Sequence, residues 1–183
     1  MKAVRGQTMG AVFETERLIL REWTLDDAAA AFEIYGDPEV TRFLGATGEP
    51  DPSLEYRRER MPAMVERYAE HPGYGIWAMV RREDGEVIGG AGLVTLEEGP
   101  EVEIAYTLRR GVWGRGFATE VALGTIGYGF GTLGLNRMVG VAYPENVASH
   151  RVMLKAGMRH LGQRLAYGHQ LEWFEMERGE WGG

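Results

Sequence analysis

The stretch EIAYTLRRGVWGRGFATEV, residues 103–121, joins a strand pattern to a helix pattern through one glycine-rich turn. Residues 101–109 favour a β-strand, and residues 117–130 favour a helix despite their glycines. LNRMVGVAY, residues 135–143, is predicted to form the next strand. Strand–helix–strand order around a tight glycine turn indicates an α+β domain built on one mixed sheet.

The rest of the chain fits the same plan. Thr24 suits the N-cap of a helix over 25–35, which Gly36 and Pro38 are predicted to end. Glu83-Asp84-Gly85 predicts a hairpin turn, because glycine accepts positive φ. The other predicted strands cover 15–23, 74–82, 86–96, 158–167 and 169–178, and the other predicted helices cover 39–45, 54–70 (kinked or restarted at Pro62) and 145–157.

A length of 183 residues favours a single domain with a real core. Residues 1–12 are predicted to be a flexible N-terminal tail, and residues 13–183 to form the domain. No apolar run approaches the roughly 18 residues of a membrane span, and the first residues lack the apolar core of an export signal. We therefore expect a cytoplasmic protein with no membrane partner.

The formal net charge is −7 at pH 7, whereas nucleic-acid-binding proteins usually present a basic surface. We therefore expect no nucleic-acid partner. An acidic surface suits a cationic substrate such as an amine, although most acidic surfaces only keep a protein soluble.

The chain contains no cysteine, which excludes disulfides, thiolate metal sites and a cysteine nucleophile. If the protein transfers an acyl group, it does so without an acyl-cysteine. The four histidines show no metal-ligand spacing, and the HEXXH motif and paired-carboxylate calcium loops are absent. We therefore expect no bound metal.

Two glycine clusters compete as nucleotide-binding motifs. Gly129-Phe-Gly131-Thr-Leu-Gly134 matches GxGxxG, but a dinucleotide site requires a strand before the motif and a helix after it. Here a predicted helix precedes the motif and a predicted strand follows. We interpret it as the C-terminal turn of a helix, so the hypothesis of a nucleotide-dependent oxidoreductase fails on context.

The second cluster, residues 111–116, has the right context for an anion. A strand ends at Arg109, and a helix is predicted to begin near Arg115. Glycines expose backbone N–H groups, and a helix N-terminus adds unpaired donors and partial positive charge. Arg109, Arg110 and Arg115 add charge. The alternative is a plain turn with solvated arginines.

Several segments together resemble the GNAT superfamily of N-acetyltransferases, and most closely its ribosomal-protein N-terminal (alanine and serine) acetyltransferase branch. The resemblance covers nearly all of residues 14–181 in the expected order. The matching segments are TERLILREWTLDDA, VTRFLG, EIAYTL, WGRGFATEV, NVASHRVMLKAGM and HQLEWFEMERGEW.

The resemblance implies a twisted sheet with helices on both faces, splayed between the strands 101–109 and 135–143. The pantetheine arm of acetyl-CoA would lie in the resulting cleft, and its pyrophosphate on the turn that opens the next helix. The cofactor contacts implied are Tyr106, Leu108, Arg109, Arg110, Gly111, Gly114, Arg115, Gly116, Phe117, Ala118, Thr119 and Asn146. The family usually has Gln or Arg where this chain has Gly111, so a side-chain contact from that position is missing.

Glu103 is the candidate catalytic base, because it lies in mid-strand near the expected splay and shares a strand face with Glu101. The alternative is an exposed strand glutamate. With no cysteine, direct attack of the amine on the thioester is the natural mechanism. The expected reaction is transfer of an acetyl group to a primary amine, either a protein N-terminus or a small molecule.

Asn146 and Ser149 begin the helix 145–157, where both suit helix capping. The resemblance implies in addition that both face the pantetheine, with Ser149 near the sulfur. Many GNAT enzymes carry a tyrosine on this helix as the proposed acid for the thiolate, and here Met153 occupies that position. Ser149 is therefore the substitute candidate.

Several aromatic residues have two interpretations. Tyr106 and Trp113 flank the turn, where aromatics more often pack than react. Four other aromatic residues either line an acceptor pocket or belong to the core, and the core is the favoured interpretation. They are Tyr35, Phe43, Tyr74 and Trp77. A homodimer is possible, and a non-catalytic acyl-CoA-binding or regulatory domain on the same fold is the alternative function.

Overall fold

The computed structural model describes residues 10–45, 47–96 and 99–182. Its strands are Ala11–Glu14 (β1), Leu18–Arg21 (β2), Gly75–Arg81 (β3), Val87–Thr95 (β4), Val102–Leu108 (β5), Arg137–Ala142 (β6), Arg159–Ala166 (β7) and His169–Glu177 (β8). Its α-helices are Ala28–Tyr35 (α1), Pro38–Thr41 (α2), Leu54–Glu70 (α3), Phe117–Gly131 (α4) and Val147–Lys155 (α5).

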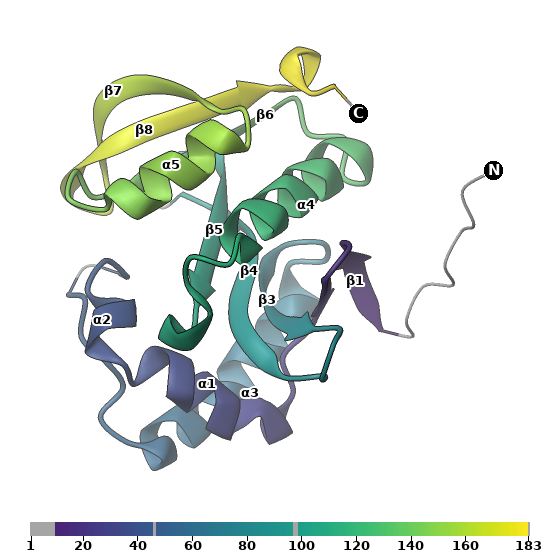
Figure 1. The fold of residues 1–183 in the computed structure, drawn as a ribbon, viewed down its shortest axis with the longest axis vertical. Coiled ribbons are helices and arrows are strands. Elements are labelled where there is room, and N and C mark those ends of the chain that lie inside the picture. Colours follow the sequence, from purple (N-terminus) through teal and green to yellow (C-terminus); the bar gives the residue numbers. More distant parts are fainter. Residues whose placement is uncertain (1–9, 46, 97–98, 183) are drawn as a thin grey trace.

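The strands form one sheet in the order β1-β2-β3-β4-β5-β6-β8-β7 (Figure 1). The paired strands of the described chain are all antiparallel except β5 and β6, which run parallel. A parallel pair needs a crossover connection, and α4 supplies it. The prediction of an α+β domain with a mixed, mostly antiparallel sheet is confirmed.

The N-terminal strands differ from the prediction. Residues 11 and 12, which were expected in the tail, belong to β1, whereas residues 1–9 lie outside the described residues. The ring of Phe13 stacks on Tyr128 at 5.5 Å and meets Trp77 edge-on at 6.0 Å, so burial of this side chain holds the short strand on the sheet. The strand expected over 15–23 is confined to Leu18–Arg21.

The first helices also depart from their predicted bounds. A 3-10 turn precedes α1, and the Asp27 carboxylate accepts a hydrogen bond from the Thr24 backbone N–H at 2.8 Å. Pro38 was predicted to help end the first helix. In the structure it is also the first residue of α2. The helix predicted over 39–45 is only one turn long, and α3 continues through Pro62 without interruption.

Helices cover both faces of the sheet. Ile104 of β5 packs with Ala122 and Ile126 of α4 on one face. Gly90 of β4 faces the Tyr35 hydroxyl of α1 on the other. Figure 1 shows α4 and α5 side by side in front of the sheet.

The sheet is splayed at its centre, as predicted. The β4 and β5 strands match over seven residue pairs from Gly89↔Leu108 to Thr95↔Val102, whereas β5 and β6 match only at Glu103↔Val139. The backbone groups of β5 and β6 beyond this pair have no regular ladder between them. The two strands therefore separate directly beyond Glu103.

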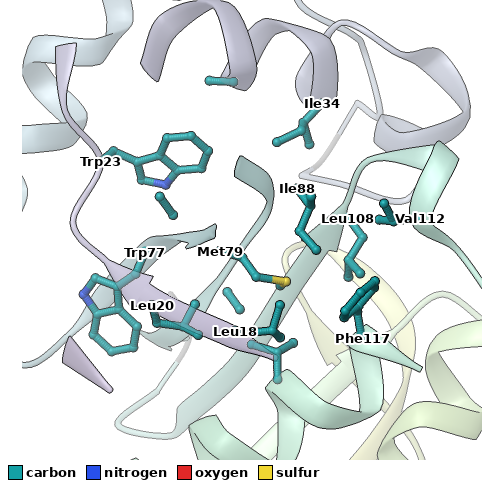
Figure 2. Close-up of a cluster of buried hydrophobic side chains, with 14 of the residues drawn as sticks. Leu18, Leu20, Trp23, Ile34, Trp77, Met79, Ile88, Leu108, Val112 and Phe117 are labelled. Atoms are coloured by element: carbon teal, nitrogen blue, oxygen red, sulfur yellow. The ribbon is translucent and has the colours of Figure 1, made fainter. Parts of the chain in front are cut away.

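Two large clusters of buried apolar side chains form most of the core. The first contains Leu18, Leu20, Met79 and Ile88, and Figure 2 shows Leu108, Val112 and Phe117 beside them. Leu108 precedes the glycine-rich turn and Phe117 follows it, so buried side chains anchor the turn at both ends. The second cluster contains Phe130, Met138, Met153 and Phe174 beneath α4 and α5.

The GxGxxG motif of residues 129–134 lies at the C-terminal end of a helix, as predicted. Gly129 and Gly131 belong to the last turn of α4, Gly134 follows with a φ of 70°, and β6 begins at Arg137. The interpretation as a helix C-terminal turn is confirmed. No strand leads into this motif, so it lacks the geometry of a dinucleotide site.

Candidate active site

A cleft of about 480 Å³ opens along β5, the glycine-rich turn, the start of α4 and one side of α5. We call it the β5–α5 cleft. Of the residues implied as cofactor contacts, it brings together Tyr106, Leu108, Gly114, Gly116, Phe117, Ala118, Thr119 and Asn146. It also includes Ser149, one of the two candidate catalytic residues.

The glycine-rich turn presents bare backbone to the cleft. Gly114 and Gly116 have φ values of 73° and 83°, in the left-handed region that favours glycine. Gly116 is the N-cap of α4 and supplies no side-chain cap. The first N–H groups of this 15-residue helix are therefore without a capping side chain, next to the positive end of its dipole.

The three arginines of the turn contact other side chains of the protein. Arg109 forms ion pairs with Glu86 at 2.7 Å and Glu33 at 3.1 Å. The Arg110 guanidinium lies 3.1 Å from the Asp37 carboxylate. The Arg115 guanidinium lies over the Phe117 ring at 5.6 Å.

None of these arginines lines the β5–α5 cleft, and Gly111 does not line it either. The cations that do line it are Arg42, Arg151 and Lys155. None of the three was among the cofactor contacts predicted from the sequence. Helical periodicity in NVASHRVMLK carries a signal for two of them, because Ala148, Arg151 and Lys155 recur at three- and four-residue spacing on one side of α5.

Asn146 and Ser149 occupy the start of α5. The Asn146 side chain accepts a hydrogen bond from the Ser149 backbone N–H at 3.2 Å, so its capping role is confirmed. The Ser149 hydroxyl lies 2.8 Å from the Tyr106 hydroxyl. Burial raises the pKa of Tyr106 to about 12, so this phenol keeps its proton at neutral pH. Met153, in contrast, is buried in the second cluster.

Glu103 lies on the other face of the sheet. Because alternate residues of a strand point to opposite faces, Glu103 faces away from Ile104 and Tyr106. Its side chain is buried, with 7% of the residue exposed, which overturns the alternative of an exposed strand glutamate. The Tyr167 hydroxyl donates to the Glu103 carboxylate at 2.6 Å. Burial raises the pKa of Glu103 to about 7, against the opposing effect of hydrogen bonds from Tyr167 and the Val141 backbone.

The other predicted aromatics divide between the cleft and the core. Phe43 lines the β5–α5 cleft, and its ring lies 5.9 Å from that of Tyr143. Trp77 is buried in the first cluster, where Figure 2 shows it beside Leu20. Tyr74 borders a second hollow of about 380 Å³, away from the cleft. Trp113 is half exposed, and its indole N–H donates to the Leu108 carbonyl at 2.8 Å, which braces the turn.

Comparison with known proteins identifies the family. A family model described as an acetyltransferase (GNAT) domain matches residues 17–159. The chain belongs to the GNAT family of acetyltransferases. This GNAT protein is 36% identical over 163 residues to YoaA of Bacillus subtilis, an uncharacterized N-acetyltransferase, with 88% of this chain and 90% of YoaA covered. The family and this relative identify it as an enzyme that transfers acyl groups.

Solved structures share the fold of this GNAT protein. Mycobacterium smegmatis RimJ in complex with CoA-disulfide aligns with a TM-score of 0.76 at 20% identity, over 91% of this chain and 84% of RimJ. AAC(6')-Ib in complex with ribostamycin and coenzyme A aligns with a TM-score of 0.72 at 18% identity, over 90% and 96%. Both likenesses show that the fold is shared.

The described residues were predicted to contain neither a membrane span nor a metal site. In the ranges 10–45, 47–96 and 99–182, no helix combines the length and apolar character needed to cross a membrane. Over the same ranges, no group of three or more histidine and carboxylate side chains is arranged to hold a metal ion.

Proposed function

We propose that the protein transfers an acetyl group from acetyl-CoA directly to a primary amine. The observation that carries the proposal is the β5–α5 cleft, which runs from the uncapped N-terminus of α4 along β5 to Tyr106 and the start of α5. The exposed N–H groups of a helix start and a groove along a strand are thereby joined in one cleft. Acetyl-CoA is a ligand with a pyrophosphate at one end and a reactive thioester at the other.

The pyrophosphate is proposed to lie on the turn that contains Gly114 and Gly116. Neither glycine carries a Cβ, so the oxygens can approach the N–H groups of residues 114–119. Arg151 and Lys155 are proposed to add positive charge from α5, in place of the three turn arginines. The pantetheine is proposed to follow β5 past Leu108 and Tyr106.

Glu103 is proposed to take the proton from the attacking amine. The cleft with Ser149 lies on one face of the sheet and Glu103 on the other, so the acceptor would approach through the gap between β5 and β6 from the Glu103 side. The amine nitrogen bonds to the thioester carbon, the carbon–sulfur bond breaks, and the amine proton passes to the carboxylate. A base with a pKa of about 7 is well matched to this work near neutral pH.

Ser149 is proposed to donate a hydrogen bond to the departing thiolate. The Tyr106 and Ser149 hydroxyls lie 2.8 Å apart, and either oxygen can donate. We propose that Tyr106 donates to the Ser149 oxygen, which leaves the serine proton to point toward the sulfur. Together they would replace the tyrosine that this family usually carries at the position of Met153.

Thiol release from acetyl-CoA tests the proposal, and the absence of cysteine removes any background from the protein itself. The acceptor panel contains peptides with N-terminal alanine or serine, as the ribosomal-protein branch suggests, together with a polyamine and an aminoglycoside. We expect amine-dependent thiol release, with a product heavier by one acetyl group. Acetyl-CoA binding without such release for any acceptor would instead support the non-catalytic acyl-CoA-binding function. A cytoplasmic location and a homodimer stay predictions.

A further inference from the structure

The turn between β7 and β8 has an unusual residue in it. Ala166 ends β7 and His169 begins β8, so Tyr167 and Gly168 form a two-residue hairpin turn. Their φ values are 52° and 74°. Turns of this type favour Asn-Gly or Gly-Gly, because both central residues have positive φ. In the part of the chain that the structure describes, Tyr167 is the one residue other than glycine with positive φ.

The strained conformation delivers a hydroxyl to a buried carboxylate. The Tyr167 side chain packs against the small cluster of Leu96, Val139 and Trp173. Its hydroxyl donates to the Oε2 atom of Glu103 at 2.6 Å, between residues 64 positions apart in the chain. A residue in an unfavourable backbone region persists when its surroundings hold it there, and such residues cluster at functional sites.

We propose that Tyr167 is a positioning residue for the catalytic base, holding one oxygen of Glu103 so that the other faces the acceptor amine. The proposal rests on the function proposed above for Glu103. Tyr167 keeps its own proton, and the amine proton passes to the carboxylate, which also accepts a hydrogen bond from the Val141 backbone. A donor aimed at a carboxylate favours its charged form, so Tyr167 both orients the base and keeps it ionised at lower pH.

Other ionisable groups also lie on the strands around Glu103. On β5, the charge of Glu103 acts on Tyr106. Glu101 is paired with Arg137 at 3.1 Å, and Glu175 lies 3.7 Å from both Arg137 and Arg159. His169 borders the turn, with its ring 5.3 Å from Tyr143. Replacing Tyr167 by Phe changes none of these groups.

The test is the pH dependence of kcat/KM for amine-dependent thiol release by Tyr167→Phe, which removes one oxygen and keeps the ring. We expect the limb on which kcat/KM rises with pH to move up by about one pH unit, with a loss of about tenfold below pH 7 that disappears at high pH. Tyr167→Asn is the second variant, because Asn tolerates positive φ, and it should displace the limb in the same direction. In a Glu103→Gln background, Tyr167→Phe should cause little further loss.

Two variants serve as controls. Tyr143→Phe removes a hydroxyl that donates to the Gly45 carbonyl at 3.2 Å, and its limb should stay at the wild-type position. His169→Gln should keep the limb, whereas a vanished limb would assign it to the imidazole and overturn the proposal. An unmoved limb in both Tyr167 variants, or a loss equal at every pH, overturns the positioning role alone. An inactive wild type overturns the proposed function as well.

Discussion

Replacing Glu103 by Gln should stabilise the protein at alkaline pH. The ordinary glutamate pKa of 4.5 rises to about 7 because the carboxyl group is buried. The folded protein therefore binds this proton more tightly than the unfolded chain does. The contribution of Glu103 is then most favourable below pH 4.5, and it is lost as the pH rises toward 7.

The size of the effect follows from that interval. At 1.36 kcal/mol per pKa unit, the ionised Glu103 costs the wild type about 3 kcal/mol above pH 8. Gln is neutral and nearly isosteric, and its carbonyl can still accept from Tyr167. We expect Glu103→Gln to match the wild type within about 1 kcal/mol at pH 5 and to exceed its free energy of unfolding by about 2–3 kcal/mol at pH 8.5.

Urea unfolding followed by circular dichroism at pH 5 and pH 8.5 measures this difference directly. Glu101→Gln is the matched control directly before the same strand, because Glu101 is partly exposed and paired with Arg137 at 3.1 Å. Its effect should stay below about 1 kcal/mol at both pH values. If Glu103→Gln is no more stable than the wild type at pH 8.5, the carboxylate is not held in the buried environment described here.

Four further variants probe the cleft. Ser149→Ala should lower kcat several-fold while leaving the affinity for CoA nearly unchanged, and equal turnover by steady-state assay would reject its role. Gly116→Ala should weaken CoA binding in calorimetry, because an L-residue at a φ of 83° is strained. Gly111→Ala, with open space around it, is the matched control that should bind normally. Arg151→Gln and Lys155→Gln should each weaken CoA binding less at high salt than at low salt, and a salt-independent effect would exclude direct charge contacts.

Local patterns predicted the centre of the molecule well. The strand–turn–helix junction, the helix-terminal position of GFGTLG and the capping by Asn146 depend on residues close in sequence. β1 escaped prediction because it is four residues long and is held by Phe13 packing against distant rings. A pattern of that length carries no periodic signal.

The surroundings of the candidate catalytic groups needed the tertiary structure. The partners of Arg109 come from α1 and from the residue just before β4, and no spacing in the sequence links them to the turn. The burial of Glu103 and its contact with Tyr167 depend on the hairpin at the far end of the chain. The sequence therefore indicates which residues are candidates for catalysis and cofactor binding. The fold determines their partners and which cations line the cleft.

The most direct test of direct transfer with Glu103 as the base is the pH profile of amine-dependent thiol release by the wild type and by Glu103→Gln. Rates are compared at equal concentrations of neutral amine, so that titration of the acceptor cancels. We predict a wild-type rate that rises through a limb near pH 7, and a variant that is slower by about 100-fold or more at pH 8 and lacks that limb. Profiles of the same shape and height for the two proteins would contradict the account.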